Sequence, residues 1–349
     1  MQTQVNDVIR EDLETITSGA RGALQRVVNS HVVLTGASGF IGKWLTLSFL
    51  HAREELGGDG ELILNCRNSA PLQELLREAK FSRGYEILEC DVRHFPEDII
   101  QDETLLIHAA TPARATLNSE NPLEMFDIII EGQKRLLHLA SMKKSVRFLF
   151  LSSGAVYGPQ PMDLVGIPET WVGAPDVNNS SNAYHEGKRA AELIGNIYSS
   201  TSTLEFVSAR LFAFLAPFLP LNEHFAAGNF IQDAVQRNPI QIKSGGGSIR
   251  SYQYSTDLCI WLWNLLVLAD QGSVFNVGSD EAISIKGLAN LVAQESKSDV
   301  SVKVLGKDNS TNLSRYVPDI SRANEHHDLV NTVPAAVAIQ RMYRWLTQP

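Results

Sequence analysis

The stretch "VVLTGASGFIG", residues 32–42, decides the fold of this chain. A short apolar run enters a turn with glycines at 36, 39 and 42, and "KWLTLSFL" continues directly from it. Spaced glycines between a strand and a helix predict a phosphate-binding corner, with a close-packed turn as the alternative. Gly36 permits the tight turn, Gly39 lets the backbone approach a pyrophosphate, and Gly42 allows close helix packing. The helix N-terminus offers free N–H groups and a positive dipole end to the phosphates.

Beyond this corner, short apolar runs alternate with helical patterns. The predicted strands are 31–36, 61–66, 85–92, 104–110, 146–153 and 205–214, and the predicted helices between them are 42–56, 71–80, 121–142 and 183–200. Continuously apolar strands indicate a parallel sheet covered on both faces. The pattern predicts an α/β fold, a doubly wound (Rossmann) parallel sheet with a smaller α/β substrate-binding lobe.

The expected domains follow from this alternation. An N-terminal helical extension should cover residues 1–29, because apolar residues recur at helical spacing over 5–28, which predicts one amphipathic helix there. The dinucleotide-binding domain should cover 30–212 and the substrate-binding lobe mainly 213–349, with about 251–280 returning to the Rossmann domain. Within the lobe, "PIQIKSGGGSIRSYQY" resembles two strands joined by a glycine-rich turn.

Composition excludes several classes of function. The 349 residues are 44% hydrophobic and carry a formal net charge of -9, which disfavours binding to nucleic acid or an anionic membrane. The three cysteines, Cys66, Cys90 and Cys259, have no metal-ligand spacing, so we expect no metal and a reducing compartment. The polar, acidic N-terminus is unlike a signal peptide, and no apolar run approaches ~20 residues. These features predict a soluble cytoplasmic protein.

The end of the second predicted strand bears on the choice of dinucleotide. An acid there would hold the ribose of NAD, whereas a nearby arginine accommodates the 2′-phosphate of NADP. The sequence "LNCRN" (64–68) has no acid but contains Arg67, which favours NADP, unless Arg67 is a surface residue stacking on adenine. Asp91, after the third strand, is either a contact to the adenine amino group or a turn residue.

A second group of residues carries acid–base chemistry. Tyr184 and Lys188 are four apart on one face of a predicted helix, and a strand ends at Ser152 and Ser153. Free tyrosine titrates near ~10, but a nearby ammonium and a positive nicotinamide ring favour tyrosinate. A serine hydroxyl at the strand end can orient the reacting oxygen. Each feature alone is common, but together they indicate a catalytic site.

In these motifs the chain resembles the extended short-chain dehydrogenases/reductases, the nucleotide-sugar epimerase/dehydratase group. The shared motifs follow the order of that family and cover nearly all of the chain after residue 30: "TGASGFIG" (35–42), Asp91-Val92, "IHAAT" (107–111), "SSGAVYG" (152–158), Tyr184-x-x-x-Lys188, "ARLF" (209–212), "RSYQYSTDL" (250–258), "FNVGS" (275–279) and "YVPDISRA" (316–323).

The resemblance implies roles for individual residues. It makes Ser153, Tyr184 and Lys188 the catalytic triad, with Lys188 also holding the nicotinamide ribose. The cofactor-binding residues that it implies, together with Arg67, are Gly36, Ser38, Gly39, Phe40, Ile41, Gly42, Asp91, Val92, His108, Ala109, Ala110, Tyr184 and Lys188. The implied substrate-binding residues are Thr111, Ser153, Gly154, Asn229, Arg250 and Arg315, of which Arg250 matches the usual clamp on a nucleotide-sugar phosphate.

Three departures from the family pattern narrow the reaction. The positions after Ser153, which carry an acid pair in 4,6-dehydratases and a glutamate in UDP-glucuronate-type decarboxylases, are Gly154 and Ala155. Dehydration and decarboxylation are therefore disfavoured. A frequent asparagine after "ARLF" is Ala213, and Arg315 is only a candidate for the late phosphate arginine.

Three functions stay open. The first is a nucleotide-sugar oxidoreductase or C4 epimerase that uses NAD(P) and Tyr184. The second is an NADPH-dependent ketoreductase of a 4-keto sugar nucleotide or another small ketone, and the third is a non-catalytic cofactor sensor. The resemblance also implies a homodimer formed through the helices around Glu124–Met142 and Tyr184–Tyr198.

Overall fold

The computed structural model describes residues 5–348, apart from 113–114, 222–224, 297–299 and 308–312. The α-helices are α1 Asp7–Gly19, α2 Arg21–Val27, α3 Phe40–Leu56, α4 Ala70–Glu78, α5 Ala115–Glu120, α6 Pro122–Ser141, α7 Ala183–Thr201, α8 Ala226–Val235, α9 Ser255–Leu268, α10 Ile285–Glu295, α11 Ser321–His327 and α12 Ala335–Thr347. The strands are β1 Val32–Thr35, β2 Leu62–Cys66, β3 Glu86–Glu89, β4 Leu105–His108, β5 Arg147–Ser153, β6 Glu205–Leu211, β7 Ile240–Ile242, β8 Ile249–Arg250, β9 Val274–Val277, β10 Ile283–Ser284, β11 Val302–Val304 and β12 Arg315–Tyr316. Short 3-10 helices cover Val92–His94, Gly154–Tyr157 and Ser180–Asn182.

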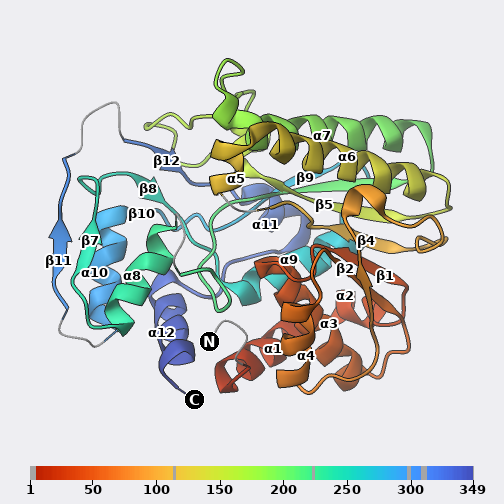
Figure 1. The fold of residues 1–349 in the computed structure, drawn as a ribbon, viewed down its shortest axis with the longest axis horizontal. Coiled ribbons are helices and arrows are strands. Elements are labelled where there is room, and N and C mark those ends of the chain that lie inside the picture. The colour runs from red at the N-terminus through yellow and green to blue at the C-terminus, as the bar shows by residue number, and fades with distance from the viewer. Residues whose placement is uncertain (1–4, 113–114, 222–224, 297–299, 308–312, 349) are drawn as a thin grey trace.

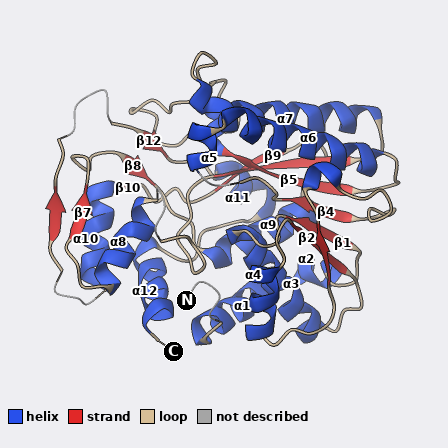
Figure 2. Cartoon of the chain, viewed as in Figure 1, coloured by secondary structure: helices blue, strands red, loops and turns tan. Residues whose placement is uncertain are grey.

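A parallel sheet forms the centre of the molecule, as the sequence predicts (Figure 2). Within the described residues it has seven strands in the order β3-β2-β1-β4-β5-β6-β9. The chain leaves β3 at one edge and crosses back over β1 to β4, so the strand order reverses between β1 and β4. In sheets of this kind, ligands bind at the carboxyl ends of the strands beside that reversal.

The two faces of the sheet bury different side chains. Val32 and Leu34 of β1 pack into the core shared with α1–α4 and α9, whereas Val33 between them packs into the core shared with α6 and α7. Figure 1 shows these two helical layers on opposite sides of the sheet. Successive strand residues point to opposite faces, so a strand buried on both faces is apolar at every position.

The smaller lobe lies beside the carboxyl ends of the strands (Figure 1). β8 pairs with β10 and β12, β7 pairs with β11, and helices α8, α10 and α12 pack together around a core of their own. The two strands expected in 239–254 both form, but they pair with different partners and not with each other. Strand β9 pairs with β6, which places residues 274–277 in the central sheet.

The N-terminal extension forms two helices rather than one. Helix α1 ends at Gly19 and α2 begins at Arg21, and both pack against α3 and α9, while α1 also contacts α12 of the smaller lobe. The side chains Val8, Ile9, Leu13 and Ile16 are fully buried or nearly so. Among the described residues, no helix combines the length and the apolar character needed to cross a bilayer.

Candidate active site

The glycine corner between β1 and α3 has the geometry that close approach to a ligand requires. Gly36 has a φ of 74°, in the left-handed region that favours glycine. A Cβ on Gly36 would lie 2.5 Å from the carbonyl oxygen of Ala109, and a Cβ on Gly42 would overlap the Gly36 carbonyl oxygen. The corner therefore has no room for side chains at these two positions. A bound ligand would contact the backbone there.

The N-terminus of α3 opens beside this corner. Gly39 is the N-cap residue, with φ -74° and ψ 171°, and it has no side chain to bond the free N–H groups of the first turn. Phe40 and Ile41 form that turn, and the Phe40 ring lies 6.3 Å from the Phe214 ring. Burial raises the pKa of the Cys66 thiol at the end of β2, and the nearby Ser38 hydroxyl opposes that shift. Uncapped N–H groups on a glycine corner fit the pyrophosphate of a dinucleotide.

Charged residues gather at the ends of β2 and β3. Arg67 is exposed, and its charge contributes to the lowered pKa of Asp91. The main cause of that lowering is Arg93, which binds both oxygens of the Asp91 carboxylate at 2.9 Å. Arg93 also pairs with Glu124 of α6 at 3.2 Å, and Val92 between the two residues is buried. The Asp91 carboxylate is thus engaged by the chain itself, while Arg67 faces solvent.

His108 ends β4 next to the glycine corner. Its Nδ1 lies 2.7 Å from the Thr35 hydroxyl, and its ring stacks on Phe150 with centroids 5.7 Å apart. Burial, together with the charge of Lys188, lowers the pKa of His108 to about 3, so the ring is neutral. Its Nε2 is buried and makes no hydrogen bond with the described residues. Ala109 and Ala110 follow, and the Ala109 N–H donates to the Thr35 carbonyl at 3.2 Å.

Ser153, Tyr184 and Lys188 meet at the carboxyl end of β5. The Lys188 ammonium donates to the Leu151 carbonyl at 2.6 Å and to the Thr111 hydroxyl at 2.9 Å. It lies 5.9 Å from the centre of the Tyr184 ring. The sequence-predicted triad is therefore brought together, because α7 packs on the sheet so that one helical face points to the end of β5.

Burial shifts the titration of these groups. It lowers the pKa of Lys188 to about 7, and the Glu192 carboxylate opposes the shift. It raises the pKa of Tyr184, and the nearby Ser153 hydroxyl opposes that shift. Both shifts disfavour the charged form, as desolvation does. The pKa values of the two groups are thus moved apart, with that of Lys188 below that of Tyr184.

An aromatic ring fills the space beside Gly154. A Cβ on Gly154 would lie 2.6 Å from the Phe212 ring. The Tyr316 ring packs against Phe212, with centroids 4.6 Å apart. The Phe212 ring thus leaves no room for a side chain at position 154.

The expected substrate residues are spread over the lobe. Arg250 of β8 bonds the hydroxyl of Ser314 at 2.9 Å and is paired in register with Tyr316. Arg315 donates to the Val165 carbonyl at 2.9 Å, so its guanidinium is held by the loop that follows β5. Asn229 lies in the first turn of α8, and Thr111 is bonded by Lys188. The substrate roles of these residues stay predictions.

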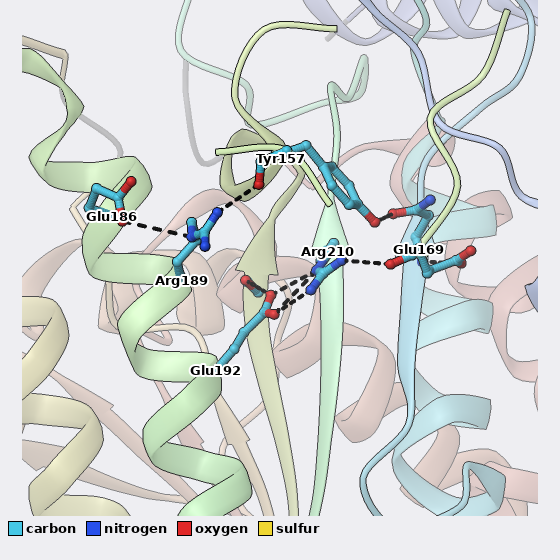
Figure 3. Close-up of polar contacts among 9 residues, drawn as sticks. Tyr157, Glu169, Glu186, Arg189, Glu192 and Arg210 are labelled. Atoms are coloured by element: carbon cyan, nitrogen blue, oxygen red, sulfur yellow. Dashed lines mark hydrogen bonds and ion pairs between the residues drawn. The ribbon is translucent and has the colours of Figure 1, made fainter. Parts of the chain in front are cut away.

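Sequence reasoning missed a buried ion pair behind the triad. Figure 3 shows Glu192 of α7 facing Arg210 of β6, with the Tyr157 ring beside the arginine. The Arg210 guanidinium contacts Glu192 at 2.7 Å, and the same carboxylate accepts a hydrogen bond from Ser152. The spacing of Glu192, four residues after Lys188, was the available signal. This pair fixes α7, and with it Lys188, on the sheet.

Comparison with known proteins gives the family. Residues 32–278 match the NAD dependent epimerase/dehydratase family. The chain is 28% identical over 296 residues to UDP-glucuronic acid decarboxylase 1 of Arabidopsis thaliana, covering 84% of this chain and 64% of the relative, less than two thirds of its length.

Two solved structures share the fold. An epimerase from Methanothermobacter thermautotrophicus has a TM-score of 0.79 at 19% identity, covering 95% of this chain and 96% of the other. The UDP-glucuronic acid 4-epimerase of Bacillus cereus, in complex with UDP-glucuronic acid and NAD, has a TM-score of 0.76 at 18% identity, covering 91% of this chain and 99% of the other. These likenesses confirm the predicted fold, and the family match confirms the resemblance read from the motifs. The chain belongs to the NAD-dependent epimerase/dehydratase family.

Proposed function

We propose that this chain catalyses hydride transfer at C4 of a nucleotide-activated sugar and works as a C4 epimerase. One observation carries the proposal: Tyr184, Lys188 and Ser153 converge at the end of β5, whereas Phe212 fills the space at Gly154. The site therefore has the groups for oxidising a hydroxyl and reducing a ketone. At positions 154 and 155 it has no acid for a further proton transfer.

Each residue of the site has its own role in the proposed reaction. A bound nicotinamide dinucleotide supplies the acceptor and the donor of the hydride. Tyr184 takes the proton of the C4 hydroxyl during oxidation and returns it to the C4 oxygen during reduction. The Lys188 ammonium favours the tyrosinate form, and the Ser153 hydroxyl bonds the reacting oxygen and holds it toward Tyr184.

The glycine corner would bind the dinucleotide, and the smaller lobe would bind the sugar nucleotide. The corner and the N-terminus of α3 fit the pyrophosphate of the dinucleotide. Arg250 of β8, on the side of the lobe, would bind the diphosphate of the sugar nucleotide. The names of the relatives support uridine diphosphate sugars as the substrates, since one decarboxylates UDP-glucuronic acid and another epimerises it.

A product assay tests this function. The purified protein is incubated with NAD and, in separate reactions, with UDP-glucose, UDP-N-acetylglucosamine and UDP-glucuronic acid, and products are followed by NMR. We expect inversion at C4 with all carbons kept. Loss of C6 as carbon dioxide from UDP-glucuronic acid would contradict the proposed epimerisation and would indicate a decarboxylase instead.

Arg67 favours a second candidate, an NADPH-dependent ketoreductase. The end of β2 has no acid, and the exposed Arg67 would be available to bind a 2′-phosphate. The two candidates differ in how they hold the cofactor, because an epimerase regenerates its cofactor within one turnover. Cofactor that survives gel filtration favours the epimerase, and turnover that requires added NADPH favours the reductase.

We also propose a homodimer formed through α6 and α7. These helices pack against each other on one face of the sheet, and Leu123, Leu193 and Ile197 on them are exposed. Covering these side chains would remove apolar surface from water. Light scattering measures the molar mass in solution, and the mass of a single chain would overturn the proposed dimer.

A further inference from the structure

Helix α7 has no cap from the residue that precedes it. The side chain of this N-cap residue, Asn182, makes no bond to the first turn and donates instead to the Asp176 carbonyl at 2.9 Å. The N–H groups of a first helical turn have no acceptor within the helix itself. Tyr184 lies in this turn, because α7 begins at Ala183. The Tyr184 N–H therefore needs an acceptor from outside the helix.

Asn118 of α5 supplies that acceptor. Its carboxamide oxygen accepts the Tyr184 N–H at 3.0 Å, although the two residues are 66 positions apart in the chain. Its carboxamide nitrogen donates to the Ser181 carbonyl at 2.5 Å, in the short 3-10 helix that leads into α7. Helix α5 packs against this 3-10 helix, which brings the side chain within reach. One carboxamide thus caps α7 and also fastens the turn before it.

The stretch between β4 and α6 contacts the triad a second time. Its Thr111 hydroxyl accepts a hydrogen bond from the Lys188 ammonium at 2.9 Å, while Asn118 holds the backbone of Tyr184. On the side of the sheet, the Leu151 carbonyl accepts a further bond from Lys188. The helical face that carries the tyrosine and the lysine is therefore held both by β5 and by the stretch that follows β4.

We propose that Asn118 is a positioning residue of the active site, which caps α7 from α5 and so holds Tyr184 toward the end of β5. An uncapped first turn frays more readily than the middle of a helix, because its N–H groups lose their only acceptors. Tyr184 belongs to that turn, so loss of the cap acts on the tyrosine before it acts on the rest of α7. The inference rests on the proposed role of Tyr184 as acid and base.

Amide hydrogen exchange tests the cap without any substrate. Exchange at the Tyr184 N–H is followed by NMR in the purified full-length protein with NAD added. In Asn118→Ala this amide should exchange about fivefold faster or more, which is the factor that corresponds to a typical N-cap replaced by alanine. The amide of Ala191, two turns further along α7, should keep its rate. Unchanged exchange at Tyr184 would overturn the proposal.

A conservative variant isolates the oxygen that accepts the bond. Asn118→Asp keeps an acceptor for the Tyr184 N–H but has no donor for the Ser181 carbonyl. Asparagine and aspartate are about equally good caps, so this variant should keep exchange at Tyr184 slow. Exchange as fast as in Asn118→Ala would refute the assignment of the carboxamide oxygen as the cap.

The neighbouring helix provides a matched control. The Asn121 carboxamide oxygen caps α6 by accepting the Glu124 N–H at 3.5 Å, and α6 carries no residue of the triad. Asn121→Ala therefore also removes an asparagine cap close to the site. It should change neither the exchange at Tyr184 nor kcat, and a loss of kcat equal to that in Asn118→Ala would contradict a specific role for Asn118.

The kinetics provide a second readout. In Asn118→Ala, kcat should fall about threefold or more, because the phenol reaches the reacting oxygen less often in the productive geometry. KM for the dinucleotide should stay unchanged, and Asn118→Asp should recover most of kcat. A raised KM with unchanged kcat would overturn the positioning role. If the wild-type protein turns over no sugar nucleotide, the proposed function fails, and exchange at Tyr184 still decides whether Asn118 caps α7.

Discussion

The phenol of Tyr254 donates a 2.5 Å hydrogen bond to the Asp12 carboxylate, and the same carboxylate pairs with Arg341. Asp12 belongs to the N-terminal helix α1, Tyr254 precedes α9 of the central domain, and Arg341 belongs to α12 of the smaller lobe. Asp12 is fully buried, and burial raises its pKa to about 7 although both partners oppose the shift. The N-terminal extension thus ties the two parts of the molecule together through one carboxylate.

Asp12→Ala should lower the free energy of unfolding by about 3 kcal/mol at pH 8, because Arg341 and Tyr254 would lose their buried partner. Urea unfolding followed by circular dichroism measures this change. Glu11→Ala is the matched control, since Glu11 pairs with Arg344 at 2.6 Å on the exposed side of the same helix. That variant should cost less than about 1 kcal/mol. An equal loss of unfolding free energy in the two variants would show that the buried contacts of Asp12 do not join the two parts of the molecule.

His108 should make the fold sensitive to acid. Its pKa is lowered to about 3 in the folded protein, below the ~6.5 of an unfolded chain. Between these two pKa values the histidine is protonated in the unfolded state and neutral in the folded state. Stability is therefore lost as pH falls below ~6.5, by about 2 kcal/mol between pH 7 and 5.

The measurement compares urea midpoints of the wild type and His108→Gln at pH 7 and pH 5. The glutamine has no titratable group, and its amide can still bond Thr35. The variant should therefore lose less stability than the wild type over this range. Parallel losses in the two proteins would rule out His108 as the cause.

Tyr184→Phe should lower kcat by about 10²–10⁴-fold, because it removes the acid and base while the ring still fills its place. Binding of the dinucleotide, measured by calorimetry, should change little. Tyr198→Phe on the same helix serves as the control and should keep its activity. Full turnover by Tyr184→Phe would exclude the triad as the catalytic centre.

Gly154→Ala should destabilise the protein by about 1–3 kcal/mol, because its Cβ would meet the Phe212 ring at 2.6 Å. Gly154→Glu should lower the melting temperature further and should not produce dehydratase activity. In Phe212→Leu the added methyl has more room, so the cost of Gly154→Ala should be smaller in that background. If Gly154→Ala destabilised both backgrounds equally, contact with the Phe212 ring would not be the reason that position 154 requires glycine.

Arg67→Ser should weaken NADP binding at least about tenfold and leave NAD binding almost unchanged, because only NADP has a 2′-phosphate for the guanidinium. Fluorescence titration with both reduced dinucleotides measures the ratio of the two affinities. Arg83→Ser, an exposed arginine before β3, provides the control for net charge. An equal effect on both dinucleotides would assign Arg67 to the adenine or to the surface.

Much of this architecture is readable along the chain. A buried parallel strand is apolar at every position, and the glycine corner needs residues without side chains, so both leave local signals that a sequence displays. Tyr184 and Lys188 share a helical face for the same reason, since four residues make about one turn. The predicted sheet, the glycine corner and the shared helical face of Tyr184 and Lys188 all follow from such local rules.

Other features depend on contacts between distant segments. Residues 239–254 read as a strand pair because the glycine-rich turn is a local hairpin signal, but each strand finds its partner elsewhere in the lobe. The single helix read over 5–28 breaks near Gly19, where a Cβ would meet Ile260 of α9 at 2.5 Å. Such events are set by packing between elements, which no local pattern records.

The sequence by itself determined the central sheet, the glycine corner and the helical face that Tyr184 and Lys188 share, because periodicity and glycine geometry act over a few residues. Only the tertiary structure decided that Phe212 fills the space beside Gly154, that Tyr316 packs against Phe212, and that Asp12 meets Tyr254 and Arg341. The residues in these contacts lie up to 329 positions apart along the chain. Folding alone brings such residues within reach of each other.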